Sequence, residues 1–202
     1  MQIRPLLLAL GFAIAVAVAA FPSRADAAPA TPEALITELG NKTVSLLQQK
    51  QLPETERQKQ FRSLLHEGFD MNQMSRFVLG PHWRTATDQQ RQEFVRLFED
   101  YIVIAYSARF SQYSGEQFKV VGSRPEGDGS LVTSQILRTS GGPPIKVDWR
   151  VGKQGAAYKI NDVVVEGVSL LVTQRQEFAS VIQRNGGQLD ALLKLMREKT
   201  QR

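Results

Sequence analysis

The chain has 202 residues, a formal net charge of +5, 42% hydrophobic residues and no cysteine. This size fits one domain with its own hydrophobic core, and the cysteine-free sequence excludes a disulfide-stapled scaffold, thiol chemistry and a thiolate metal site. Because the basic residues are spread along the chain without a long run, no nucleic-acid partner is expected.

The N-terminal segment is typical of a secretory signal peptide. Arg4 supplies a positive charge, residues 6–20 form an apolar run, and residues 25–27 (Ala-Asp-Ala) have the small-x-small cleavage pattern. The apolar run is shorter than the ~20 residues that span a bilayer, which favours a cleaved signal over a transmembrane anchor. We therefore expect a signal peptide over residues 1–27 and a single periplasmic domain over residues 28–202.

Helical periodicity dominates the first half of this domain. Thr31 is a candidate N-cap, Asp70 caps a short helix that ends at Gly80, and Thr87 with Gln90 forms a capping box. The predicted helices cover residues 31–51, 54–67, 70–80 and 87–113. The last of these is apolar over a wide stripe, which indicates that it is largely buried.

After Gly115 the apolar residues recur at every second position, which predicts strands. The predicted strands cover residues 117–123, 131–139, 145–152 and 157–166. Short turns rich in glycine and proline separate them, so successive strands should pair as an antiparallel meander with one apolar face. Helices over residues 169–184 and from Leu189 onward follow. The predicted fold class is α+β: a four-stranded antiparallel curved sheet covered by helices.

The sequence contains few candidates for catalytic residues. His66 and His82 lie in no metal-binding spacing, and Ser169 lacks the second glycine of a nucleophile elbow and is better explained as a helix cap. The sequence contains no phosphate-binding glycine motif. We expect no enzyme activity, no metal and no cofactor; Asp162 is the one acid that an enzymatic function would use.

Four stretches carry a family resemblance. They are RFVLGPHWRTATDQQRQEF (76–94), AYSARFSQYSGEQF (105–118), GGPPIKVDWRV (141–151) and YKINDVVVEGVSLLVTQRQEF (158–178). In order and spacing they resemble the MlaC, or toluene-tolerance, family of periplasmic phospholipid-binding proteins, which includes the hopanoid-associated HpnM-like members. The resemblance covers nearly the whole chain after residue 27. Two positions depart from the family pattern: Trp149 replaces an expected Tyr, and Gln174 replaces a common aromatic residue.

The resemblance implies a curved sheet and helices that enclose an apolar cavity for acyl chains, with the head group at its mouth. It implies a carrier that moves phospholipid between an outer-membrane lipoprotein complex and an inner-membrane ABC transporter with an MCE-domain component, and so maintains outer-membrane lipid asymmetry. We expect the carrier to be a monomer. The alternatives are a hopanoid-associated lipid carrier and an envelope adaptor protein whose core is filled.

Apolar residues of the predicted helices and strands are the candidate lipid-binding residues, and ordinary core packing is the alternative for each. They are Phe98, Tyr101, Ala105, Val132, Ile136, Val147, Trp149, Tyr158, Ile160, Val163 and Phe178. Arg150 and Arg175 are the candidates for a contact with the head-group phosphate, since guanidinium groups bind phosphate well.

Overall fold

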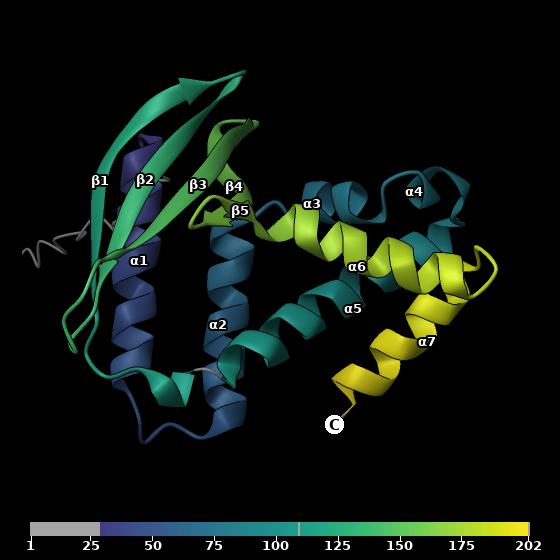
Figure 1. Ribbon diagram of the computed structural model, residues 1–202, viewed down its shortest axis with the longest axis horizontal. Coiled ribbons are helices and arrows are strands. Elements are labelled where there is room, and N and C mark those ends of the chain that lie inside the picture. Colours follow the sequence, from purple (N-terminus) through teal and green to yellow (C-terminus); the bar gives the residue numbers. More distant parts are fainter. Residues whose placement is uncertain (1–28, 109, 202) are drawn as a thin grey trace, which may run out of the picture.

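The computed structural model describes residues 29–108 and 110–201 and has an α+β architecture, with a curved sheet at one end and a group of helices at the other (Figure 1). The predicted signal peptide lies outside these described residues. The α-helices are α1 (Pro32–Gln48), α2 (Glu54–Gly68), α3 (Met71–Leu79), α4 (His82–Thr85), α5 (Asp88–Ser107), α6 (Leu170–Arg184) and α7 (Leu189–Thr200).

The sheet is an antiparallel meander in which each strand pairs with its neighbours in the sequence. Its strands are β1 (Gln117–Glu126), β2 (Gly129–Leu137), β3 (Ile145–Gln154), β4 (Ala157–Val165) and β5 (Val168–Ser169). The prediction of four strands was wrong by one, because β5 is only two residues long. It returns from β4 through a tight turn in which both Glu166 (φ 49°) and Gly167 (φ 82°) are left-handed.

Two irregularities interrupt the ladder of hydrogen-bonded pairs. In β1 the register shifts between Val120 and Gly122, so that Val121 has no partner on β2. In the β3–β4 pair the register shifts after Arg150, and Asn161 is the extra residue. Bulges of this kind bend a strand and increase its twist, and Figure 1 shows the long strands curving around α1.

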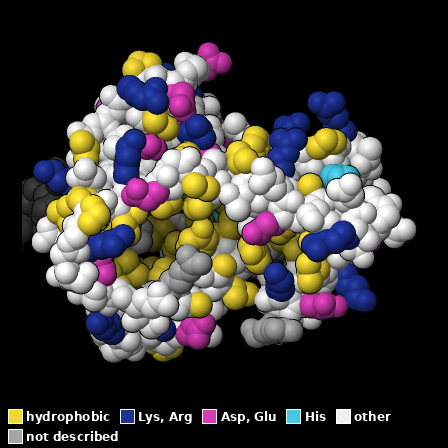
Figure 2. All heavy atoms as spheres, viewed as in Figure 1, with side chains coloured by type: hydrophobic (Ala, Val, Ile, Leu, Met, Phe, Trp, Pro, Cys, Tyr) yellow, Lys and Arg dark blue, Asp and Glu magenta, His cyan; other side chains and the backbone are white. Residues whose placement is uncertain are grey.

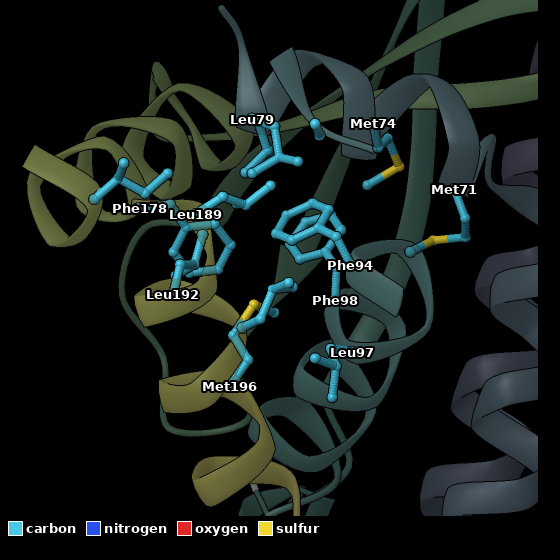
Figure 3. Packing of buried hydrophobic residues seen from close by; sticks show 14 of the residues in the cluster. Met71, Met74, Leu79, Phe94, Leu97, Phe98, Phe178, Leu189, Leu192 and Met196 are labelled. Carbon is cyan, nitrogen blue, oxygen red and sulfur yellow. The ribbon is translucent and has the colours of Figure 1, made fainter. Parts of the chain in front are cut away.

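Two separate hydrophobic cores hold the described part of the chain together. One lies between α1 and the sheet face that we call the inner face; its buried members are Leu35, Ile36, Leu39, Val132, Val151 and Ile160. The other is formed by α3, α5, α6 and α7 and includes Phe94, Phe98, Phe178, Leu192 and Met196. Figure 3 shows these side chains pointing toward one another between the helices, so the helical core is filled.

The junction of α2 and α3 connects the two cores. Phe69 packs against both of them, and the Asp70 backbone N–H donates to the Ile160 carbonyl of β4 at 3.0 Å. Between α2 and α5, Arg62 forms ion pairs with Glu99 and Asp100. The sheet and the helical group are therefore joined along one side by α2.

Two boundaries differ from the prediction. The helix expected to reach residue 113 ends at Ser107 and is followed by a short 3-10 helix, Phe110–Gln112. The segment from His82, between two predicted helices and with no helix predicted for it, forms the single helical turn α4. The caps were predicted correctly: Thr87 and Gln90 form a capping box, and the Ser169 hydroxyl accepts from the Val172 N–H at 3.1 Å.

Candidate functional site

The inner face of the sheet has a packed part and an uncovered part. On β3, Val151 is 2% exposed and belongs to the core against α1, whereas Ile145 at the other end is only partly buried. Ile136, which lies opposite Ile145 on β2, is also partly buried. Neither isoleucine belongs to the two cores, although Phe118, the neighbour of Ile136 on β1, packs against α1. The uncovered part of the inner face therefore lies at this end of β2 and β3.

The molecule is hollowed beside this uncovered part. Figure 2, drawn in the orientation of Figure 1, shows a hollow between the sheet and α2 with hydrophobic side chains gathered around it. The register places further partly buried apolar side chains on the inner face; they are Phe118, Val120, Trp149, Val163 and Val165. An apolar hollow of this kind suits hydrocarbon rather than a charged ligand.

Trp149 has a fixed position on the inner face. Its indole N–H donates to the Ser134 hydroxyl at 2.8 Å, and that hydroxyl donates to the Val147 carbonyl at 3.2 Å. The Phe118 ring lies edge-on to the indole, with 6.2 Å between centroids. The polar atom of the tryptophan is therefore satisfied within the sheet, and the rest of the side chain presents an apolar surface.

The candidate lipid-binding residues fall into two groups. Val132, Trp149, Tyr158, Ile160 and Val163 lie in or against the sheet core, and Ile136 and Val147 lie on the same inner face. Phe98 and Phe178 belong to the helical core, with Tyr101 packed against it.

Rings of the helical group contact one another closely. Phe178 makes edge-to-face contacts with Phe94, Phe98 and Tyr101, with centroids 5.9 to 6.1 Å apart. Partial burial raises the pKa of the Tyr101 hydroxyl. Ala105, on the same helix, is partly buried. The structure thus brings the sheet residues together beside the hollow and places Phe98 and Phe178 inside a filled core.

The two candidate head-group arginines are engaged elsewhere. Arg150 follows Trp149 in the strand, so its side chain points away from the inner face. On the opposite face it pairs with Glu126 at 2.9 Å and with Asp162 at 2.7 Å. The Arg175 guanidinium lies 5.2 Å from the centre of the Phe77 ring and against Gly80. These contacts give Arg150 a structural role on the opposite face of the sheet and Arg175 one between α3 and α6.

Asp162 has the hydrogen bonds of a structural carboxylate. It accepts from Arg150, from the Ser169 hydroxyl at 2.7 Å and from the N–H groups of Val163 at 2.8 Å and Leu171 at 3.3 Å. It thereby fastens the start of α6 to β4. Among the described residues, no group of three or more histidine or acidic side chains is arranged to hold a metal ion.

Two grooves lie elsewhere on the surface. One, of about 330 Å³, runs between α1 and α2 and is lined by Asn41, Lys42, Ser45, Leu46, Gln49, Gln60 and Leu64. The other, of about 270 Å³, includes His66, Asp70, Glu99 and Lys159. Both linings include charged side chains that an acyl chain would remove from water, which makes the hollow beside the sheet the better site for an apolar ligand.

Several inner-face residues are missing from the predicted lipid-binding set. Phe118, Val120, Ile145 and Val165 lie on the same face as Trp149. The two-residue alternation of the predicted strands places each of them on the apolar face and could have added them. Ser134 could not have been found in this way, because its role depends on its hydrogen bond with the Trp149 indole.

Comparison with known proteins agrees with this arrangement. The MlaC protein family matches residues 37–198. The intermembrane phospholipid transport system binding protein MlaC of Haemophilus influenzae is 25% identical over 125 residues, which cover 60% of this chain and 58% of the relative. The toluene tolerance protein ttg2D of Pseudomonas putida is 25% identical over 53% of this chain and 50% of the relative. The matched segments thus span about half the length of these relatives.

A solved structure shares the fold. It is that of a phospholipid-binding protein from Ralstonia solanacearum in complex with a phospholipid; it covers 85% of this chain and 97% of its own, with a TM-score of 0.73 and 20% identity. Over the part of the chain that the structure describes, no helix is long and apolar enough to cross a membrane. The family match extends from α1 to α7, over the sheet and both cores, and the chain therefore belongs to the MlaC family.

Proposed function

We propose that the protein is a periplasmic carrier that binds a phospholipid by its hydrocarbon chains in the hollow beside the inner face of the sheet. The observation that supports this most directly is the set of partly buried apolar side chains there, including Ile136, Ile145, Trp149 and Val163. These residues line the cavity, while Phe98, Phe178, Val132 and Ile160 support it from the two cores.

The energetics of transfer require such a cavity. Each methylene exposed to water costs ~0.8 kcal/mol, so a lipid with ~30 methylenes represents on the order of 20 kcal/mol of exposed hydrocarbon. A carrier must cover these chains and still release them. A preformed apolar hollow meets both needs, because it shields the acyl chains from water without forming strong, directional polar bonds to them.

The same proposal covers location and partners. The expected signal peptide over residues 1–27 would export the chain, and the carrier would exchange lipid with an outer-membrane lipoprotein complex and an inner-membrane ABC transporter that has an MCE-domain component. The names of the relatives support this, since the Haemophilus influenzae protein belongs to an intermembrane phospholipid transport system. We expect no catalytic turnover, because Asp162 is bound to four donors.

Native mass spectrometry of protein purified from the periplasm, followed by lipid extraction, tests the proposal. We expect one phospholipid per chain in the wild type and loss of it in Ile136→Asp and Ile145→Asp, because a carboxylate in the hollow opposes hydrocarbon. Val121→Asp is the matched control, since Val121 is 56% exposed in the β1 bulge. Folded wild-type protein free of lipid would refute the proposal, and bound hopanoid would change the identity of the cargo.

A further inference from the structure

The position of Trp149 on β3 separates the packed part of the inner face from the uncovered part. Along this face of the strand the residues are Val151, Trp149, Val147 and Ile145. Val151 is packed against the α1 core, and Ile145 lies at the uncovered end. Trp149 is therefore the largest side chain at the boundary between the two.

The indole extends toward the uncovered end. Its N–H reaches Ser134, which pairs not with Trp149 but with Val147, one step further along the inner face. Ser134 is 0% exposed and Val147 is 4% exposed, although they belong to the strand ends beside the hollow. The indole contacts Ser134 and so contributes to this burial, and the partly buried surface further along the inner face begins at Ile136 and Ile145.

The indole is also held from the side of β1. Phe118, which pairs with Ile136, contacts the edge of the indole and itself lies against α1 at Gly40, where an added Cβ would come within 2.2 Å of the phenyl ring. Helix α1 thus sits as close to Phe118 as a glycine allows. The hydrogen bond to Ser134 and this edge-to-face contact together fix the position of the indole.

Trp149 nevertheless keeps a partly exposed surface. It lies on the third of five strands, with Val132 and Val163 as its cross-strand neighbours, so a sheet edge does not account for this exposure. The exposed surface must face open space on the inner face, which is the side of the hollow.

We propose that Trp149 forms the end wall of the apolar cavity and thereby sets the longest acyl chain that the protein covers completely. This inference rests on the proposed function. A chain that is too long for the cavity leaves methylenes in water, and a chain that is too short leaves a void against the indole. Selectivity between chain lengths should therefore change about fourfold for each methylene that gains or loses cover.

To test this, bound lipid is removed and the protein is reloaded from an equimolar mixture of dimyristoyl, dipalmitoyl and distearoyl phosphatidylglycerol. Native mass spectrometry then measures which of these lipids is bound. We expect Trp149→Val to shift the bound lipid toward longer chains by about fourfold or more per methylene gained, and Trp149→Phe to shift it in the same direction by less. Ile136→Phe narrows the uncovered part and should shift the preference toward shorter chains.

Trp83→Val is the matched control, because Trp83 is the other tryptophan of the sequence and packs against the helical core. It should keep the wild-type preference. If all variants bind lipid with the same acyl-chain lengths as the wild type, Trp149 does not set the chain length, and the proposed carrier function is unaffected. Wild-type protein that takes up none of these lipids would overturn both. Should Trp149→Val fail to fold, Trp149→Phe and Ile136→Phe still test the role of Trp149. The first should shift the bound lipid toward longer acyl chains and the second toward shorter ones.

Discussion

At the scale of single residues, two-residue alternation predicted which strand side chains share the apolar face. Trp149, Val147 and Ile136 all lie on the inner face, as the alternation in the predicted strands 131–139 and 145–152 indicates. The alternation also predicts that Arg150 points the other way, but its ion pair with Asp162 depends on which strands pair and in which register. A single strand carries no information about its partner, so such pairs could not be read from the sequence.

Asp162 offers a test of a structural rather than a catalytic role. Asp162→Ala leaves the Arg150 guanidinium, the Ser169 hydroxyl and two backbone N–H groups without their acceptor. We expect the free energy of unfolding to fall by about 2–4 kcal/mol, measured by urea denaturation. Asp162→Asn keeps the shape and one oxygen acceptor and should lose less. Equal stability of Asp162→Ala and the wild type would contradict this role.

Asp148 predicts a pH dependence of stability. Burial alone would raise the pKa of its carboxyl, but the hydrogen bond from Thr133 at 2.6 Å and the ammonium group of Lys146 outweigh burial and lower the pKa below its ordinary value of 3.8. A lowered pKa in the folded state gives stability that is complete above the unfolded value and is lost as the pH falls through the folded value.

We therefore expect the free energy of unfolding of the wild type to fall more steeply below about pH 4 than that of Asp148→Asn, which cannot titrate. Urea denaturation at a series of pH values measures both slopes. Asp128→Asn, in the exposed turn between β1 and β2, is the control and should follow the wild type. Parallel curves for the wild type and Asp148→Asn would show that Asp148 contributes nothing to acid stability.

At the scale of helices and strands, the elements with strong local signals were predicted and the weak ones were not. The start of α5 was marked by the Thr87 capping box, which the structure confirms. Its end was not marked, because the apolar pattern continues past Ser107 into the short 3-10 helix. Strand β5 was missed because the turn before it places Glu166, rather than a glycine or asparagine, in a left-handed conformation.

The close approach of α1 to the sheet makes an unusual prediction for Gly40. In a helix interior alanine is normally about 1 kcal/mol more favourable than glycine. Here the new methyl group would meet the Phe118 ring, so we expect Gly40→Ala to destabilise the protein by about 1–3 kcal/mol in urea denaturation. The double variant Gly40→Ala with Phe118→Ala should show a favourable coupling energy. Additive effects would mean that the two residues do not meet.

At the scale of the whole molecule, the α+β class followed from the order of helical and alternating segments, whereas the presence of two cores did not. Phe98 and Phe178 were predicted to form one lining with Trp149 and Ile160, but the structure separates them. Apolar periodicity shows that a side chain faces the interior; it does not show which core, or which open space, that interior is.

The hollow beside the inner face also predicts how bound lipid affects stability. A ligand that binds only the folded state stabilises it by about 3–4 kcal/mol at 100 to 1,000 times its dissociation constant. Protein stripped of lipid should therefore unfold at a lower temperature than loaded protein, as followed by circular dichroism. Restoring phosphatidylglycerol should recover the difference. An unfolding temperature that does not change on removal of lipid would mean that bound lipid does not stabilise the folded protein.

The bulge in β1 bears on how copies of this molecule behave beside one another. An outermost strand with a straight row of unpaired amide groups invites a second chain to add to it, which leads to aggregates. In β1 the unpartnered Val121 interrupts that row, and Pro125, which has no N–H, follows in the same strand. The proposed carrier would have to diffuse as separate particles, and an edge that resists extension by a second copy would suit it.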